Sequence, residues 1–438
     1  MALSSSTVWE VRTTGSDTNG GGFVTGASGT DWSQQNSPQY SVTDAVTAGT
    51  TTITSATANF GTDVVGNILY ISGGTGSITG DWYQITSRTN STTIVVDRST
   101  GLTTGTGATL KIGGAFATPG RLNSPMVTGN KAWIKTGTYT LTTSTAGPGG
   151  PVSVSGKNGL EFEGYSATRG DLGTPPTISA GAIANITIFD FGGSSGSSRC
   201  AINIKVDGNS QSTITGFNNA QNLCIKCIAA NCTTAGFNNV LCLSCFASGC
   251  GVGFGGIPAA HYCYAKNCTT GYNLNTSTFL FGCIAYGGTT SFNLAGVNFQ
   301  GNACVNCVAY DPTGVGFLDG SGSRTLYLAN CIAVSCTYGL QTLSRTTYRK
   351  FAYYNCSLAG VNVSSGQTMG DSAIALSADP FTNASGDDFS LNSVAGGGAL
   401  LKALGIDATL FQTQTANYLD LGAAQVQASS GGYARRPR

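Results

Sequence analysis

A short pattern of apolar and small residues repeats through the middle of the chain, from about residue 200 to residue 361. Its anchor is an apolar residue, a spacer, Cys, a spacer and usually Ala, as in Ile225-Cys227-Ala229. Glycine and then a large apolar residue follow most anchors eight or nine residues later, as in Gly236-Phe237. The anchor cysteines recur every 18 to 25 residues, at Cys227, Cys245, Cys263, Cys283, Cys307, Cys331 and Cys356.

This spacing predicts a solenoid of short strands. Apolar positions two residues apart have the period of a strand, and β-branched residues, Gly, Asn and Ser fill the repeats. Repeats of about 20 residues with this period are typical of a parallel β-helix, in which coils about 4.8 Å apart stack equivalent side chains. We therefore expect a Cys ladder and a Phe/Tyr ladder to form two walls of one core.

The residue immediately after each anchor Cys forms a second apolar series. If the anchor faces the core, this residue faces outward, and an apolar stripe of that height is seldom left exposed. Two explanations stay open: the stripe packs three parallel β-helices about a common axis, or a loop or the C-terminal segment covers it within one chain. The candidate trimer interface comprises Ile228, Phe246, Tyr264, Ile284, Val308 and Ile332.

The segments that flank the repeats lack the Cys pattern. Alternating stretches separated by Gly-rich turns predict a small β domain, with strands near residues 51–56, 67–72, 82–89, 93–97 and 108–112. We expect four parts: an N-terminal strand and turn segment (1–39), the small β domain (40–112), the parallel β-helix (113–365), and a C-terminal cap and tail (366–438). The cap is expected to contain a short helix around Ala399 to Leu404 and a run from Tyr418 to Ala423.

Composition narrows the function classes. Only 9% of residues are charged and the net charge is +1, so no electrostatic case exists for binding nucleic acid or an anionic membrane. No apolar run is long enough to span a bilayer, so we expect no membrane insertion. The first residues lack a basic and then apolar stretch, so no signal peptide is expected.

The 15 cysteines allow three interpretations. An odd number in a large chain without a signal peptide argues against a disulfide framework. Zinc is suggested by the C-x2-C spacings at Cys224/Cys227, Cys242/Cys245 and Cys304/Cys307, but residues three apart on one strand face opposite sides. We therefore favour buried free thiols, with no metal and no cofactor. A second ladder is predicted from Cys232, Cys250, Cys268 and Cys336.

Candidate catalytic groups are scarce. The chain has three glutamates, and Glu161 and Glu163 share a strand face as the best local carboxylate pair, with Glu10 as the third. The single histidine, His261, lies two residues before Cys263 and is expected to face the core as a packed, hydrogen-bonded side chain. We therefore predict no catalytic residues.

Three N-terminal motifs carry a family resemblance. They are Gly15-x-Asp17-x-Asn19-Gly20, the segment Ala115–Thr118, and the segment Ile134–Tyr139. Together they resemble the first turns of right-handed parallel β-helix proteins of the pectin-lyase-like group, and with the preceding small β domain they resemble structural proteins of tailed bacteriophages. The resemblance implies a capping helix near Phe116 to Val127.

The function implied by the resemblance is that of a virion structural protein, a surface spike, fibre or decoration component that adheres to host glycan. Polysaccharide-degrading lyases or hydrolases of the same fold are the alternative. A homotrimer, other virion proteins and a host-surface glycan are the expected partners, and the protein would be made in the host cytoplasm and reside in the virion. Candidate glycan contacts are the tyrosines Tyr262, Tyr286, Tyr310 and Tyr353. Head or tail location and the receptor stay open.

Overall fold

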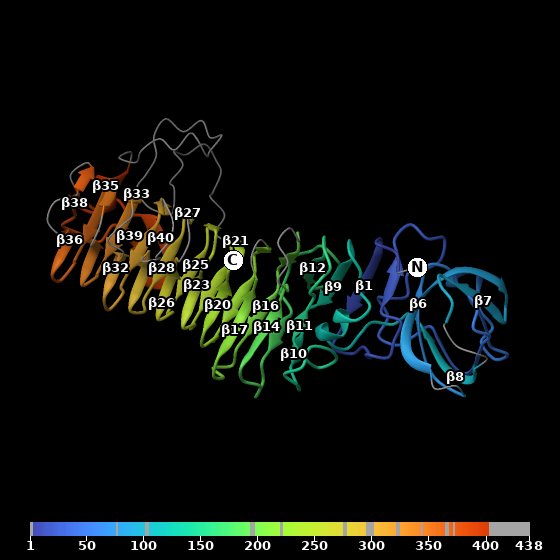
Figure 1. Cartoon of the computed structure of the whole chain (residues 1–438). Helices are drawn as coiled ribbons and strands as arrows, with labels where there is room; N and C mark the ends of the chain where they lie inside the picture. The colour runs from blue at the N-terminus through green and yellow to red at the C-terminus, as the bar shows by residue number, and fades with distance from the viewer. Residues whose placement is uncertain are drawn as a thin grey trace. The chain divides into compact units, whose positions relative to one another are not determined.

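The computed structural model describes residues 3–75, 78–100, 105–192, 198–219, 222–274, 278–294, 302–320, 325–342, 345–363, 368–370 and 373–402. The chain divides into two compact units, Met1–Asp207 and Gly208–Arg438. Strands dominate both units, and those of the coils pair in parallel (Figure 1). The predicted fold class is confirmed: a right-handed parallel β-helix with a small N-terminal β domain inserted before the coils. The division into four parts at residues 39, 112 and 365 stays a prediction.

The coils of the first unit begin at its N-terminal strand. β1 pairs in parallel with β9, and β9 with β12, whereas β2 runs antiparallel to β1. Between the coils, β10 pairs with β13, β11 with β14, β12 with β15 and β13 with β16. The bounds are β1 (Thr7–Val11), β2 (Gly22–Val24), β9 (Lys131–Lys135), β10 (Thr138–Thr140), β11 (Val152–Ser153), β12 (Glu161–Tyr165), β13 (Thr177–Ser179), β14 (Ile186–Asp190), β15 (Cys200–Ile202) and β16 (Lys205–Asp207).

The inserted domain is a closed antiparallel barrel with strand order β3-β4-β7-β6-β5-β8. Its core contains Ile53, Leu69, Ile85, Ile94 and Leu110, all 0% exposed. The alternating pattern predicted five of these strands but missed β3. The elements are β3 (Tyr40–Thr47), β4 (Thr52–Thr54), the 3-10 helix η1 (Thr62–Val64), β5 (Ile68–Gly73), β6 (Ile78–Asn90), β7 (Thr93–Val96) and β8 (Gly105–Ile112).

Two of the motifs behind the family resemblance meet where the barrel returns to the coils. The Asp17 carboxylate accepts hydrogen bonds from the backbone N–H groups of Ala117 and Thr118, at 3.0 and 2.9 Å. Gly21 has a φ of 77°, and a Cβ there would lie 2.2 Å from the Phe116 ring. The expected capping helix is a single 3-10 turn, η2 (Pro119–Asn123), in which proline occupies the first position.

Three parallel sheets form the coils of the second unit (Figure 1). The first sheet contains β18 (Leu223–Ile225), β21 (Leu241–Leu243), β24 (Ala259–His261), β27 (Phe279–Phe281), β30 (Asn302–Val305) and the first halves of β33 (Thr325–Val334) and β35 (Arg345–Tyr354), with β37 (Thr368–Gly370). The second contains β19 (Ile228–Ala230), β22 (Phe246–Ser248), β25 (Tyr264–Lys266), β28 (Ile284–Tyr286), β31 (Val308–Tyr310), the second halves of β33 and β35, and β38 (Ile374–Ala375). The third contains β17 (Ile214–Asn218), β20 (Ala235–Asn238), β23 (Val252–Gly255), β26 (Thr270–Asn273), β29 (Thr290–Asn293), β32 (Val315–Asp319), β34 (Tyr338–Thr342) and β36 (Ala359–Val363).

A residue with left-handed backbone conformation separates the strands of each coil. We name the position between the first and second sheets the first corner, and the position between the second and third sheets the second corner. Such a residue turns the chain sharply, so the strand period of two does not continue through it. The first corner is occupied by Lys226, Ser244, Tyr262, Gly282, Asn306, Asn330 and Lys350, and the second by Asn231, Gly249, Asn267, Gly287, Asp311, Ser335 and Asn355.

The third sheet carries the predicted aromatic ladder on its inner face. Neighbouring ring centroids lie 5.1, 5.0, 4.8, 4.8 and 4.7 Å apart, and the rings are nearly parallel. This separation equals the rise between coils, so each ring packs on the equivalent ring of the next coil. The ladder comprises Phe217, Phe237, Phe254, Tyr272, Phe292 and Phe317, all 0% exposed.

The anchor thiols form the opposite wall, immediately after the first corner. The Cys245 thiol donates to the Cys224 carbonyl at 3.2 Å, and burial raises the pKa of the Cys224 thiol, which keeps its proton. The strand register shows that Cys356 is not the last anchor. Cys331 pairs with Phe351, so Phe351 occupies the anchor position of the next coil. Cys356 lies beside Cys336 and continues the second Cys ladder.

The two cysteines of a C-x2-C pair were expected to face opposite sides of the sheet, and this prediction was wrong. Cys224 and Cys227 are both buried, because the left-handed residue Lys226 lies between them. Among the described residues, no group of three or more His, Cys, Asp or Glu side chains is placed to hold a metal ion. All 15 cysteines are free.

The C-terminal elements lie after the last coil. They are β39 (Phe381–Asn383), the 3-10 helix η3 (Ala384–Gly386), β40 (Asp388–Leu391) and α1 (Gly398–Leu401), where a short helix was expected. The predicted run from Tyr418 to Ala423 lies outside the described residues. Within the described residues, no helix has the length and apolarity that a membrane span requires.

The aromatic ladder can be tested by removing one ring. Phe254→Ala should lower the free energy of unfolding by about 3–5 kcal/mol, because the cavity lies between two stacked rings. Phe246→Ala removes a half-buried ring from the outer face of the second sheet and should cost about 1 kcal/mol. Urea denaturation of both variants measures the difference. Equal losses would show that the ladder is no better packed than the outer face.

The corner geometry can be tested at Asn267, which has a φ of 54°. Asn267→Ala should destabilise the protein by about 1 kcal/mol, because a Cβ without a compensating polar group disfavours this conformation. Asn267→Gly should change stability by no more than about 0.5 kcal/mol, because glycine adopts positive φ freely. A thermal melt that ranks the glycine variant below the alanine variant would contradict the assignment.

Candidate functional site

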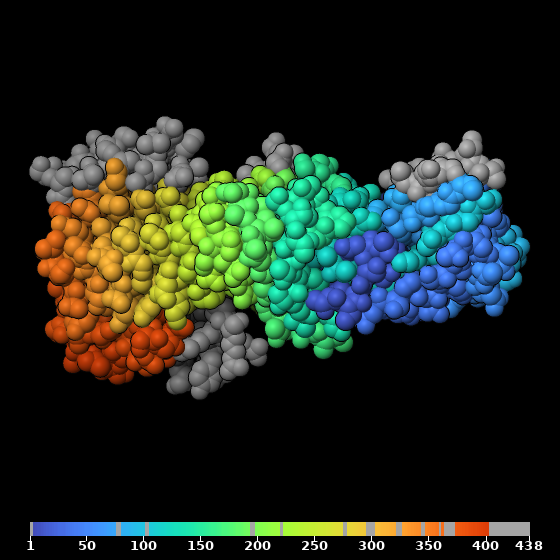
Figure 2. Space-filling view, turned by 90° about the horizontal axis from the view of Figure 1, so that it is seen from below, coloured from blue at the N-terminus to red at the C-terminus, as the bar shows by residue number. Residues whose placement is uncertain are grey.

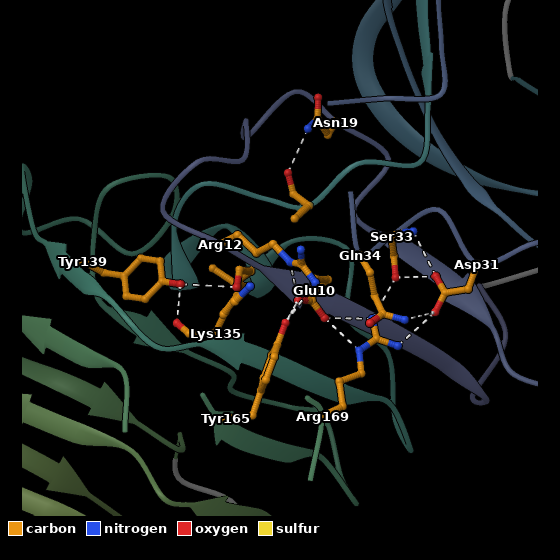
Figure 3. A network of polar contacts seen from close by, with 12 residues as sticks. Glu10, Arg12, Asn19, Asp31, Ser33, Gln34, Lys135, Tyr139, Tyr165 and Arg169 are labelled. Atoms are coloured by element: carbon orange, nitrogen blue, oxygen red, sulfur yellow. Dashed lines mark hydrogen bonds and ion pairs between the residues drawn. The ribbon is translucent and has the colours of Figure 1, made fainter. Parts of the chain in front are cut away.

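A cluster of charged side chains lies on the outer face of β1, β9 and β12 in the first unit (Figure 3). The parallel register places Trp133 between Glu10 and Glu163, and Lys131 beside Glu161. All three glutamates of the chain therefore gather on one sheet face, although their positions in the sequence span about 150 residues. We name this group the charged cluster; its members are Glu10, Arg12, Asp31, Lys131, Trp133, Glu161, Glu163, Tyr165 and Arg169.

Glu10 is the buried centre of the charged cluster, with 0% of its side chain exposed. Arg12 donates to one carboxylate oxygen at 2.7 Å, and Arg169 donates to the other at 2.8 Å. The Tyr165 hydroxyl also contacts Glu10. Burial and the Glu10 charge raise the pKa of Tyr165, so the hydroxyl keeps its proton and donates it to the carboxylate. Glu10 thus contacts two guanidinium groups and one phenol.

The guanidinium of Arg169 fastens separate segments of the first unit. Besides Glu10, it donates to the Asp31 carboxylate and the Ser33 hydroxyl, both at 2.9 Å. The loop that carries Arg169 is ordered by Asp171, whose carboxylate accepts backbone N–H groups from residues 166, 167, 168 and 173. These bonds lower the pKa of Asp171 well below its usual range. The contacts of Arg169 and Asp171 therefore hold separate segments of the first unit together.

Lys131 joins the other two glutamates. Its ammonium lies 2.6 Å from Glu161 and 2.7 Å from Glu163, and 3.7 Å from the centre of the Trp133 ring. Burial alone would lower the pKa of Lys131, but the hydrogen bonds to the two carboxylates raise it overall. The sequence identified the carboxylate pair but not this third group. The Lys131 ammonium therefore holds both carboxylates in ion pairs that join β9 to β12.

A second polar surface in the first unit is a shallow hollow of about 290 Å³. Among the described residues that line the hollow, Asp190 alone has a charged side chain. A lone acid does not meet the two-carboxylate requirement of glycoside hydrolysis. The other lining residues are Ser144, Ala146, Pro151, Ser153, Asn185, Ile186 and Thr187.

The predicted apolar stripe lies in the second unit, on the outer face of the second sheet. Ile228, Phe246, Tyr264 and Ile284 are half-buried there. Val308 and Ile332 are 0% exposed, because they pack in one cluster with the C-terminal segment, which contributes Leu376, Phe381, Ala384, Phe389, Leu391 and Leu401. Figure 2 shows this segment, coloured red, against coils coloured orange to yellow.

Polar contacts fix the C-terminal segment on the second sheet. Tyr264 and Lys266 both donate to the Asp387 carboxylate at 2.7 Å, and Tyr310 donates to Asp379 at 2.9 Å. Burial raises the pKa of Tyr264 and of Tyr310, so both hydroxyls stay protonated donors. Of the two explanations for the stripe, coverage within one chain accounts for the part from Tyr264 to Ile332. A trimer interface stays a prediction, and within the stripe it could use Ile228 and Phe246.

The four candidate glycan contacts have different surroundings. Tyr286 and Tyr310 stack at 5.6 Å and both pack against Phe389 of the C-terminal segment. Tyr353 is half-buried. Tyr262, at the first corner, is 44% exposed. It is the most exposed of the four candidates.

Sequence reasoning missed the outer face of the first sheet. His261 was expected to face the core, but it lies outside, half-buried, with its ring 5.8 Å from Phe279 and 6.2 Å from Phe281. The reason is the first corner at Tyr262, which reverses the inward and outward positions between His261 and Cys263. The sequence did contain a signal for this corner. Asn, Gly and Ser occupy other first-corner positions, and these residues favour left-handed conformation or turns.

Comparisons with known proteins give no family for this chain. No protein-family model and no curated protein matches the chain. Solved structures that match include pectate lyase Pel9A (13% identity, 72% of this chain and 92% of that chain, TM-score 0.46). Others are Geobacillus virus E2 ORF18 (12%, 56% and 52%, TM-score 0.31) and a GH87 alpha-1,3-glucanase from Streptomyces thermodiastaticus (11%, 77% and 87%, TM-score 0.34). The resemblance to the pectin-lyase-like fold rests on the parallel sheets of the structure itself.

The Asp171 loop gives a prediction about pH. A carboxylate whose pKa is lowered on folding stabilises the folded loop above its unfolded pKa of about 3.9 and loses that contribution as the pH falls below it. Protection of the amides of residues 166, 167, 168 and 173 from hydrogen exchange should therefore fall between about pH 5 and pH 2. In Asp171→Asn, protection should be weaker at pH 6 and should no longer depend on pH in this range. The same pH dependence in both proteins would assign the effect to another group.

Proposed function

We propose that this chain is a structural protein of a tailed bacteriophage particle, a surface spike, fibre or decoration component that adheres to host glycan. The observation that carries the proposal is the state of the glutamates: each is ion-paired, Glu10 with two arginines and the other two with Lys131. These ion pairs join β12 to β9 and the Arg169 loop to β1, which is a structural role. The phage assignment is supported by the N-terminal motifs and the inserted barrel.

The mechanical character of the coils supports the same role. Thiols and rings stack at the coil spacing along the second unit, and few charged groups interrupt them. A packed ladder resists deformation, since interiors at native density have low compressibility. Such an object suits the display of a fixed surface to a host cell.

Partners follow from this role. The proposed assembly is a homotrimer within the virion, in contact with other virion proteins, after synthesis in the host cytoplasm. Ile228 and Phe246 are the members of the apolar stripe outside the cluster that the described C-terminal residues form, and we propose them for a subunit contact. A host-surface glycan is the proposed external ligand.

A polysaccharide-degrading enzyme is the second candidate, favoured by one observation. Lys131 stands between two carboxylates and over the half-buried Trp133 ring, and a cation beside an aromatic ring is a feature of sugar-binding surfaces that could bind an acidic sugar. A lyase would use a basic group to remove a proton, which Lys131 could do only after release from its carboxylates.

One experiment separates the two candidates. The purified chain is incubated with a panel of bacterial-surface and plant polysaccharides, and bound polysaccharide and released oligosaccharide are measured in the same samples. We expect binding without chain cleavage. Sustained product release that Lys131→Ala abolishes, and that the control Lys205→Ala leaves unchanged, would replace the structural role with the enzymatic one.

A further inference from the structure

The outer face of the first sheet in the second unit is apolar over six strands. Two side chains per strand point outward, and the strands β18, β21, β24, β27, β30 and β33 lie in register. All of these side chains except His261 are aliphatic or aromatic, and none is an acid, lysine or arginine. We name the strip by these residues: Leu223, Ile225, Leu241, Leu243, Ala259, His261, Phe279, Phe281, Ala303, Val305, Tyr327 and Ala329.

Aromatic rings gather at the middle of the strip. Phe279 and Phe281 lie 6.5 Å apart and nearly parallel, and Tyr262 meets Phe281 edge-on at 5.5 Å. Leu243 and Tyr262 are 38% and 44% exposed, so the centre of the strip is open on its corner side. Phe281, Val305 and Ala329 are 4%, 7% and 5% exposed and form a buried cluster against which Phe279 and Tyr327 pack. The accessible part of the strip therefore lies around Leu243, His261 and Tyr262.

The backbone at Tyr262 is held in an unusual conformation. A bulky residue with a φ of 54° is uncommon, and such strain often lies at binding sites. Gly282 occupies the same corner position on the next coil, and a Cβ there would lie 2.7 Å from the Tyr262 ring. The glycine therefore makes room for the tyrosine ring to lie along the corner, beside the strip.

The dimensions of the strip limit what can bind. Six strands about 4.8 Å apart make it roughly 25 Å long, and two outward positions make it roughly 10 Å wide, an area of roughly 250 Å². A stable protein interface needs about 800 Å² on each partner. The strip is too small for a second copy of the chain and has the proportions of one extended linear molecule.

The chemistry of the strip selects the class of molecule. Stacked rings bind the apolar C–H faces of a ligand, and the hydroxyl of Tyr262 and the ring nitrogens of His261 bind polar edges. The basic residues Lys226 and Arg349 lie toward opposite ends, two coils or more from Tyr262, so nothing at the centre favours an anion. A pyranose chain without acidic groups combines apolar faces with polar edges.

We propose that the strip around Tyr262 binds an uncharged, extended oligosaccharide that lies along the coil axis. This inference rests on the proposed glycan adhesion and names the class of glycan and its site. Tyr262 and Phe279 stack on the sugar, and His261 is a hydrogen-bonding partner at the edge.

The test is binding to an array of immobilised uncharged and acidic glycans, with wild type, Tyr262→Gly and Phe279→Ala. Tyr262→Gly removes the ring and relieves the positive φ, so the fold is retained. Binding to uncharged glycans should weaken at least about tenfold in both variants. The control Leu358→Ala, at an exposed apolar side chain outside the strip and the stripe, should bind as wild type does.

The outcomes are distinguishable. Binding confined to acidic glycans, or binding that neither variant weakens, overturns the assignment of the strip and leaves glycan adhesion standing. No binding to any glycan overturns both. Light scattering on Leu243→Lys tests whether a second copy of the chain occupies the strip. We expect the same mass as wild type. A smaller assembly would show that the strip is an interface between copies of the chain.

Discussion

The coils of the second unit depend on one backbone constraint, the left-handed residue at each corner. Asn, Gly, Ser or Asp fills most of these positions, as expected from the low cost of positive φ for glycine and from the local hydrogen bonding of short polar side chains. The turn at the first corner keeps the thiol after it inside, beside the inward residue of the preceding strand. Without it, the period of two would send every anchor cysteine to the surface.

The ladders follow from that constraint. Once the corners hold the coils in register, identical positions stack at the coil rise, and like side chains pack best on like: rings on rings and thiols on thiols. Cysteine suits the wall after the first corner because it is small, apolar and able to donate weakly to a carbonyl of the preceding coil. Neutral stacking groups carry no repulsion along a ladder, which a column of charges would.

Much of this fold could be predicted from the sequence, because the anchor motif and the Gly-aromatic motif repeat locally. The strand period and the two ladders came from such repeats, and the small β domain came from the alternating stretches before them. Two errors have one physical origin, the assumption that alternation continues through the corner. It placed His261 inside and sent Cys224 and Cys227 to opposite faces. Cys356 was assigned to the wrong ladder because an apolar residue, a spacer and Cys also occur at the second corner.

The candidate sites were harder to predict, because they depend on contacts between distant residues. Arg169 meets Glu10 across 159 positions, and Tyr310 meets Asp379 across 69, with no local pattern that links either pair. The apolar stripe was recognised in the sequence. The sequence could not decide whether another copy of the chain or the C-terminal segment covers it. Packing of Phe389 and Leu401 on the second sheet makes that choice for the part from Tyr264 to Ile332.

The most direct measurement is a titration of the thiols with an aromatic disulfide reagent, in the native and in the denatured chain. All 15 cysteines are free, and only Cys200 and Cys356 are half-buried, whereas the other thirteen are buried. The account predicts that two thiols at most react in the native protein and that all 15 react after denaturation. Rapid reaction of the anchor cysteines in the native state would place them on the surface and contradict the corner geometry.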